Sequence, residues 1–126
     1  MTMEGLETKL TQLDKAFERV GESTLLVPLA PGLPSVVLHV SEPVVVAQVV
    51  IGPAAAAGAE VLRKLLELNA TDLVQASYGI SGDKIVLSAA HQLSSLDLNE
   101  LAASLVDFDL ALAEHVGQLR SMMSEN

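Results

Sequence analysis

Cysteine and tryptophan are absent from this 126-residue chain, and aromatic residues of any kind are scarce. Without cysteine the protein has no disulfide framework, no thiolate nucleophile and no cysteine-ligated zinc or iron–sulfur centre. Only two phenylalanines and one tyrosine are available to fill an interior. Because half of the residues are apolar, the core must be built from leucine, valine, isoleucine and alanine.

Basic residues are also few. Seven lysines and arginines stand against sixteen aspartates and glutamates, which gives a formal net charge of −9. The basic residues are scattered along the chain and form no cluster with interleaved aromatics. An electrostatic field of this sign repels phosphate backbones and anionic lipid head groups. We therefore expect no nucleic-acid partner.

No apolar run has the length and composition of a membrane span. The uncharged stretch from Pro43 to Ala59 is shorter than the roughly 20 residues that a spanning helix needs, and Gly52-Pro53 interrupts it. The first segment carries charges of both signs, such as Glu7 and Lys9, whereas a secretory signal needs a continuous apolar stretch. We expect a cytoplasmic protein that does not insert directly into a membrane.

Apolar residues recur at helical spacing near the start of the chain. Leu6, Leu10 and Leu13 follow one another at intervals of four and three residues. Together with the charged residues between them, they predict an amphipathic helix over residues 4–20. Gly21 is suited to end this helix, because glycine adopts the left-handed conformation at low cost.

Short apolar runs bounded by turn residues predict five strands. They span Thr24–Ala30, Ser35–Val40, Val44–Ile51, Gln75–Ile80 and Lys84–Ala89. The links between consecutive runs are short in two places, and the last two runs are separated by Ser81-Gly82-Asp83. Such links favour antiparallel hairpins.

Two further helices complete the predicted order. Ala54–Asn69 begins with four alanines and continues with a wide leucine stripe. Leu98–Met122 follows Asp97, and Glu100 completes a capping-box pattern with that aspartate. The order is helix, three strands, helix, two strands, helix. We therefore predict a single α+β domain over residues 1–126, with an antiparallel sheet.

Reactive residues are not arranged for catalysis or metal binding. The three histidines, His39, His91 and His115, lack the spacing of a metal-binding pair, and we expect them to be unrelated surface or half-buried residues. Asp107 and Asp109 lie two positions apart on a predicted helix, where such neighbours point to different sides. They predict a solvated face and not an acid/base pair. We predict no catalytic residue, no metal site and no cofactor.

Apolar residues are more abundant than a sheet with one wet face requires. In Val44–Ile51 they fall on both faces, whereas such a sheet alternates apolar and polar positions. The last predicted helix also has an apolar stripe wider than one sheet contact needs. We expect a second copy of the chain to cover part of this area. The alternative is a monomer whose first helix completes the core.

Particular apolar residues are the candidates for contacts with other chains. The residues predicted to bind a partner protein are Val36, Leu38, Val44 and Val46 on the sheet. The residues predicted to form the dimer contact are Leu105, Phe108 and Leu112 on the last helix. Both sets consist of apolar side chains alone. They therefore predict contacts with other proteins and not a catalytic or metal-binding site.

The second half of the chain carries a pattern that known families share. Leu65, Leu66 and Asn69 end a predicted helix, Gly79 lies in the hairpin that follows, and Leu101 lies in the terminal helix. This arrangement resembles the small chaperones of type III secretion systems and the related YbjN-type proteins. The resemblance implies a secretion-chaperone-like fold, a homodimer and a protein-binding role, with no catalytic residues to carry over.

A closer similarity is to the YjfI-like family of bacterial proteins. The segments that carry it are Ala76–Ile80, Leu87–Ala90 and Leu93–Ser95. The chain departs from that family before Tyr78, where Pro-Leu-Ser is expected, and at Leu87, where an aromatic residue is usual. YjfI-like proteins accompany a membrane-stress coat protein of the phage-shock type, so the resemblance implies such a protein as a possible partner.

The sequence thus predicts a non-enzymatic cytoplasmic adaptor or chaperone-like homodimer that holds an apolar segment of a partner protein. One alternative is a regulator of a phage-shock-type coat protein that binds it by helix–helix contact. Another is a small apolar-ligand-binding protein or enzyme, which needs convergent polar groups in an apolar pocket.

Overall fold

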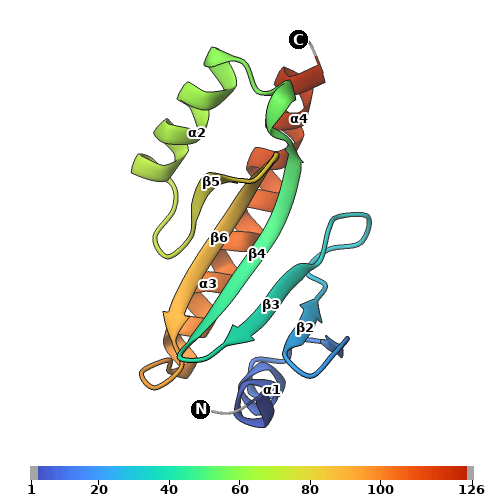
Figure 1. Ribbon diagram of the computed structural model, residues 1–126, viewed down its shortest axis with the longest axis vertical. Helices are drawn as coiled ribbons and strands as arrows, with labels where there is room; N and C mark the ends of the chain where they lie inside the picture. The colour runs from blue at the N-terminus through green and yellow to red at the C-terminus, as the bar shows by residue number, and fades with distance from the viewer. Residues whose placement is uncertain (1–2, 125–126) are drawn as a thin grey trace.

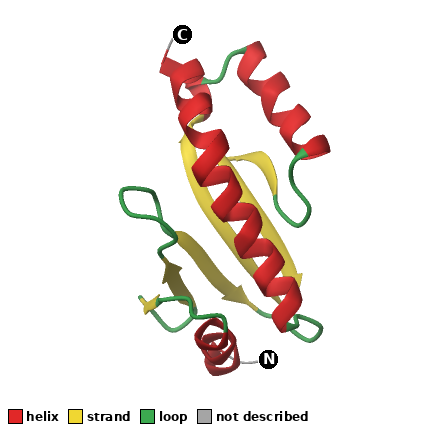
Figure 2. Cartoon of the chain, turned by 180° about the vertical axis from the view of Figure 1, so that it is seen from behind, coloured by secondary structure: helices red, strands yellow, loops and turns green. Residues whose placement is uncertain are grey.

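The computed structural model describes residues 3–124 and contains a six-stranded antiparallel sheet packed against helices. The α+β fold class and the order of the main elements are as predicted. Figures 1 and 2 show the sheet from opposite sides, and the long C-terminal helical segment crosses it on the side seen in Figure 2. One short strand, β1, is added to the predicted order.

The first helix is shorter than the sequence predicts. Helix α1 (Met3–Gln12) ends well before Gly21. Asp14 takes a left-handed conformation with φ of 58°, and the Lys15 N–H donates to the Leu10 carbonyl oxygen at 2.9 Å. This backbone geometry closes the last helical turn and redirects the chain toward the sheet. The prediction that the helix continues to Gly21 is therefore wrong.

The six strands form one sheet in the spatial order β1-β2-β3-β4-β6-β5, and all neighbouring pairs are antiparallel. The strand bounds are β1 Glu18–Arg19, β2 Thr24–Val27, β3 Val36–Ser41, β4 Val44–Pro53, β5 Ser77–Ser81 and β6 Lys84–Gln92. Gly82 has a φ of 60° in the tight turn between β5 and β6, a conformation that glycine adopts without strain.

The helix predicted from Ala54 is interrupted near its start. Ala54–Ala56 form a 3₁₀ turn, η1, and helix α2 runs from Ala59 to Thr71. The Ala54 N–H donates to the Asp83 carbonyl oxygen at 2.8 Å, so the alanine run begins tied to the β5–β6 turn. This tertiary hydrogen bond opposes the helical propensity of alanine there.

The C-terminal segment is helical throughout, as predicted. It consists of α3 (Leu98–Leu110), a π-helical turn η2 (Ala111–His115) and α4 (Val116–Ser124). The Glu100 N–H donates to Asp97 Oδ1 at 2.7 Å, which confirms the predicted N-cap. No helix within residues 3–124 is long and apolar enough to cross a membrane.

The hydrophobic core lies between this C-terminal segment and one face of the sheet. Alternate strand residues point into it, which gives β4 a strict alternation of buried and less buried positions up to Ile51. The buried residues that form the two sides are Leu25, Val27, Val36, Leu38, Val45, Ala47, Val49, Ile51, Ile85 and Leu87 on the sheet, and Leu101, Leu105, Phe108, Leu112, Val116 and Leu119 on the helical segment. We call this side of the sheet the covered face.

Candidate protein-binding surfaces

The opposite side of the sheet, which we call the open face, is turned toward the viewer in Figure 1, where no helix crosses β3, β4 or β6. The register aligns its side chains in rows across the strands. One row contains Val37, Gln48 and Ser88, and the next contains His39, Val46 and Ala90. These rows form the centre of a continuous surface because consecutive rows lie two residues apart on each strand.

Aspartate, glutamate, lysine and arginine are missing from the centre of the open face. Its residues on the three middle strands are Val37, His39, Ser41, Val44, Val46, Gln48, Val50, Val86, Ser88, Ala90 and Gln92. Within residues 3–124, the charged residues with this orientation lie at the margins, with Glu18 on β1 and Lys84 beside the β5–β6 turn. Val37 is 37% exposed and Val50 is 45% exposed. An exposed, uncharged and partly apolar sheet face is typical of a contact surface for another protein.

The open face contains two of the four predicted partner-binding residues. Val44 and Val46 lie on it and are half-buried. Val36 and Leu38 point the other way and are 0% and 1% exposed in the core. The set therefore does not form one surface, because the register places even-numbered residues of β3 opposite odd-numbered residues of β4, so that Leu38 lies opposite Ala47 and not Val46. Sequence reasoning missed Val37, which precedes Leu38 and has the orientation of Val46.

The three predicted dimer residues lie in the core of the single chain. Leu105, Phe108 and Leu112 are 1%, 0% and 4% exposed. The apolar width of the last helix thus packs within one chain, and these side chains have little area left for a second copy. Val106 is the large apolar residue of α3 that is exposed, at 62%.

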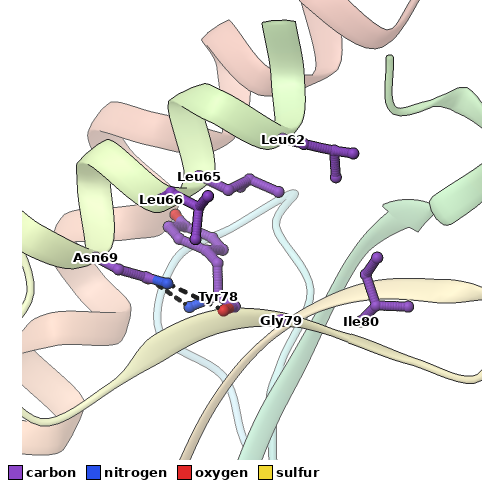
Figure 3. A pocket seen from close by; sticks show the side chains of 7 residues that line it. All are labelled: Leu62, Leu65, Leu66, Asn69, Tyr78, Gly79 and Ile80. Carbon is purple, nitrogen blue, oxygen red and sulfur yellow. Dashed lines mark hydrogen bonds between the residues drawn. The ribbon is translucent and has the colours of Figure 1, made fainter. Parts of the chain in front are cut away.

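A second apolar surface lies between α2 and β5, as Figure 3 shows. It is a groove of about 320 Å³, which we call the α2–β5 groove, lined by Leu62, Leu65, Leu66, Asn69, Tyr78, Gly79 and Ile80. Leu66 is 70% exposed and Ile80 is 59% exposed, so apolar side chains stand at its rim. No charged residue lines it. The groove is apolar enough to receive a side chain of another polypeptide.

Asn69 joins the two walls of this groove. Its Oδ1 accepts a hydrogen bond from the Tyr78 N–H at 2.7 Å, and its Nδ2 donates to the Tyr78 carbonyl oxygen at 3.1 Å (Figure 3). The carboxamide thereby makes the two hydrogen bonds that a neighbouring strand would make. One turn before Asn69 on α2, Leu65 is buried, whereas Leu66 is exposed.

Residues 1–125 match the CesT_Tir_1 family model. The chain belongs to this family of type III secretion chaperones. The family consists of binding proteins and not of enzymes. A comparison with curated proteins found no match.

Solved structures share the fold of this chain. A chain of the heterodimeric complex ExoU-SpcU from the type III secretion system of Pseudomonas aeruginosa has a TM-score of 0.70 and 18% identity, covering 96% of this chain and 99% of its own. YbjN from E. coli, described as a putative transcription regulator, has a TM-score of 0.60 and 15% identity, and the match covers 98% of this chain and 88% of YbjN. A chain from the structure of the Yersinia pestis type III secretion chaperone SycH in complex with a fragment of YscM2 has a TM-score of 0.59 and 21% identity. That match covers 85% of this chain and 95% of the other. At these identities the likeness shows the fold alone.

Asp107 of this CesT_Tir_1 chain has a structural role that the sequence did not indicate. It is only 4% exposed, which contradicts the predicted solvated face. Its Oδ2 accepts hydrogen bonds from three consecutive backbone N–H groups, those of Val74 at 3.0 Å, Gln75 at 2.5 Å and Ala76 at 2.8 Å. The carboxylate therefore fixes the link between α2 and β5 to α3. Asp109 is the more exposed of the two aspartates.

His115 forms a second polar network next to the α2–β5 groove. It is 4% exposed, so the expectation of a surface or half-buried residue is wrong. Its Nδ1 lies 2.9 Å from the Tyr78 Oη, and its Nε2 lies 2.9 Å from Asp72 Oδ2. The hydrogen bond from His115, with a smaller one from Thr71, lowers the pKa of Asp72 below 3.8. Burial, and then the charge of Asp72, raise the pKa of Tyr78, so its phenol stays protonated.

A serine, a histidine and a glutamate also lie close together, but they do not form an accessible catalytic site. His91 Nε2 lies 2.6 Å from Ser104 Oγ, and His91 Nδ1 lies 4.0 Å from Glu100 Oε2. Ser104 is 1% exposed, so its hydroxyl has no open path to a substrate. No group of three or more metal-ligating side chains occurs in the described part of the chain. The open face and the α2–β5 groove remain the candidate sites.

Proposed function

We propose that the protein is a non-enzymatic, homodimeric adaptor or chaperone of the cytoplasm that holds an apolar segment of another protein on the open face. The observation that carries this proposal is the uncharged centre of an exposed sheet face in a chain with a net charge of −9. Membership of a family of type III secretion chaperones supports it. The cytoplasmic location in this proposal is the one expected from the sequence.

The composition of the open face favours a particular kind of segment. Val37, Val46 and Val50 offer apolar contact, while Gln48 and Ser88 lie between them and offer hydrogen bonds. A segment with apolar and small polar side chains matches this surface without burying an unpaired charge. Because this chain is acidic as a whole, basic residues of the partner protein that lie outside the contact would accelerate the association of the two proteins.

The homodimer is proposed to form at the α2–β5 groove. Leu62, Leu66 and Ile80 are exposed around it, whereas Leu105, Phe108 and Leu112 have no comparable free area. A patch that contains both a groove and protruding apolar side chains suits a two-fold contact, in which each copy presents the same surface. This leaves the open face free for the partner.

Affinity purification with matched variants tests the partner-binding proposal. We expect Val46→Glu to lose a protein that co-purifies with the wild type from the source cells, because a carboxylate enters the centre of the open face. Val106→Glu is the control, since it places the same charge at an exposed position of α3. Quantitative mass spectrometry of the two eluates measures the difference.

The same experiment separates the alternatives. Equal retention by both variants would contradict the role of the open face. Loss only with Val106→Glu would favour binding through the exposed side of α3, as expected of a helix–helix contact with a phage-shock-type coat protein. A small molecule that co-purifies in place of a protein would favour the ligand-binding alternative.

A further inference from the structure

The three histidines of the chain differ in whether a carboxylate lies beside them. His91 Nδ1 lies 4.0 Å from Glu100 Oε2. His115 Nε2 lies 2.9 Å from Asp72 Oδ2. Within residues 3–124, His39 makes no such contact with an aspartate or a glutamate. A positive charge on the first two rings would be compensated locally, whereas a positive charge on His39 would not.

His39 is exposed at the centre of the open face. Its row contains Thr24, Val46 and Ala90 on the other strands, and none of these side chains is charged. The His39 Nδ1 lies 3.0 Å from Thr24 Oγ1, and its Nε2 has no hydrogen-bond partner within residues 3–124. A threonine hydroxyl can donate or accept, so this contact can hold the neutral and the protonated ring alike. Protonation therefore changes the charge at this place without requiring the ring to move.

The charged groups around His39 do not neutralise it. The side chains of β4 and β6 that share its face are uncharged. Glu18 lies on β1, two strands away, which is roughly 10 Å at the usual strand spacing. Glu22 lies in the connection between β1 and β2, and Glu42 lies in the turn between β3 and β4. Within residues 3–124 none of the three glutamates forms an ion pair with His39, and water and salt screen exposed charges that are not in contact.

A bound segment changes the surroundings of His39. In the free chain, water hydrates the exposed ring in either charge state. A segment that covers Val37 and Val46 also covers His39, which lies two residues from Val37 on β3 and opposite Val46 on β4. Burial of a charge without a partner costs free energy that burial of a neutral imidazole does not cost. The covered surface therefore favours the neutral ring over the imidazolium.

We propose that His39 is a proton-sensitive contact: the open face holds its partner segment while the imidazole is neutral and releases the segment when the imidazole takes up a proton. The inference rests on the proposed binding of an apolar segment to the open face and adds the regulation of that site. It also restricts the partner, because a carboxylate opposite His39 would bind the protonated ring more tightly. The segment therefore presents uncharged side chains to this row.

An acid step tests the release of the partner. The immobilised full chain is loaded with an extract of the source cells, and quantitative mass spectrometry follows the protein whose retention depends on Val46. Histidine ordinarily titrates at about pH 6.5, so a step from about pH 7.5 to about pH 5.5 protonates most imidazoles. We expect the apparent affinity of the wild type to fall about tenfold, whereas His39→Gln, which does not titrate, should keep the partner. His91→Gln is the control, because His91 lies opposite Val45 on the covered side, and it should release the partner as the wild type does.

A permanent charge tests the same contact without a change of pH. His39→Lys places an ammonium group in the centre of the open face, and we expect it to lose the partner at about pH 7.5 to the extent that the wild type loses it at about pH 5.5. Val106→Lys is the control, since it places the same charge at an exposed position of α3 and should retain the partner. Circular dichroism at both pH values checks that each variant is folded.

The possible outcomes distinguish the inference from the proposed function. A wild type that keeps the partner through the acid step, or binds it more tightly there, would overturn the inference and leave partner binding by the open face standing. Equal release from the wild type and His39→Gln would do the same, because another group would then be responsible. If His39→Gln does not bind at the higher pH, His39→Phe, which also takes up no proton, and His39→Lys decide the matter. If no protein depends on Val46 for retention at the higher pH, the proposed function and the inference fail together.

Discussion

The two faces of the sheet have similar residues and different surroundings. On β4, Val45 and Val49 point into the core and are each 2% exposed, while Val46 and Val50 point to the open face. The same residue type thus serves two purposes on one strand. Valines buried under α3 stabilise the fold, whereas valines on the open face are available for contact with another protein. Mutations that affect stability and those that affect binding should therefore alternate along each strand.

The largest effect is expected on the covered face. Phe108→Ala removes a fully buried side chain and should lower the free energy of unfolding by about 3–5 kcal/mol. Val50→Ala on the open face should lower it by less than about 1 kcal/mol. Denaturant unfolding followed by circular dichroism measures both. Similar losses would contradict the difference between the faces. By the same reasoning, Phe108→Asp should unfold the chain and not simply separate a dimer.

An intermediate effect is expected where a polar group is buried beside the covered face. Asp107→Ala leaves three N–H groups without their carboxylate and should cost about 3 kcal/mol. Asp109→Ala removes a partly exposed ion pair with Lys15 at 3.6 Å and should cost less than about 1 kcal/mol. Unfolding curves of the two variants provide the test, and equal costs would show that the Asp107 contacts contribute little.

The smallest effect is expected at the exposed end of the His115 network. The pKa of Asp72 is lower in the folded state than its ordinary value of 3.8, so folding favours the ionised carboxylate. Its stabilising contribution is then complete above pH 3.8 and is lost as the pH falls through the lowered pKa. We expect Asp72→Asn to be less stable than the wild type at pH values above 3.8, with the difference in stability shrinking as the pH falls below 3.8. A constant difference in melting temperature at all pH values would contradict this linkage.

Much of the fold was predictable because it follows from local sequence signals. The antiparallel strands are bounded by turn residues, Gly82 lies where a tight hairpin needs a positive φ, and Asp97 caps the last helix. The end of α1 was not predictable in this way. Asp14 takes a left-handed conformation, which is uncommon for any residue other than glycine, and it ends the helix where the spacing of apolar residues still predicts continuation.

The candidate surfaces depend on contacts between distant segments, so the sequence predicted them only in part. Alternation along each strand does not by itself show that Val36 and Leu38 face the opposite side of the sheet from Val44 and Val46. That assignment requires the register between β3 and β4. Asp107 is buried because a loop more than thirty residues earlier in the chain folds over it. Asn69 belongs to the family pattern in the sequence, but its hydrogen bonds to the Tyr78 backbone depend on the position of β5 beside α2.

Site-specific photo-crosslinking tests the central claim most directly. A photoreactive phenylalanine derivative replaces Val46 on the open face or, as a control, Val106 on α3, and the source cells are irradiated. We expect a discrete partner protein to become covalently attached through position 46 and not through position 106. Attachment through position 106 alone, or no partner adduct from position 46 while the same protein still co-purifies with the chain, would contradict it.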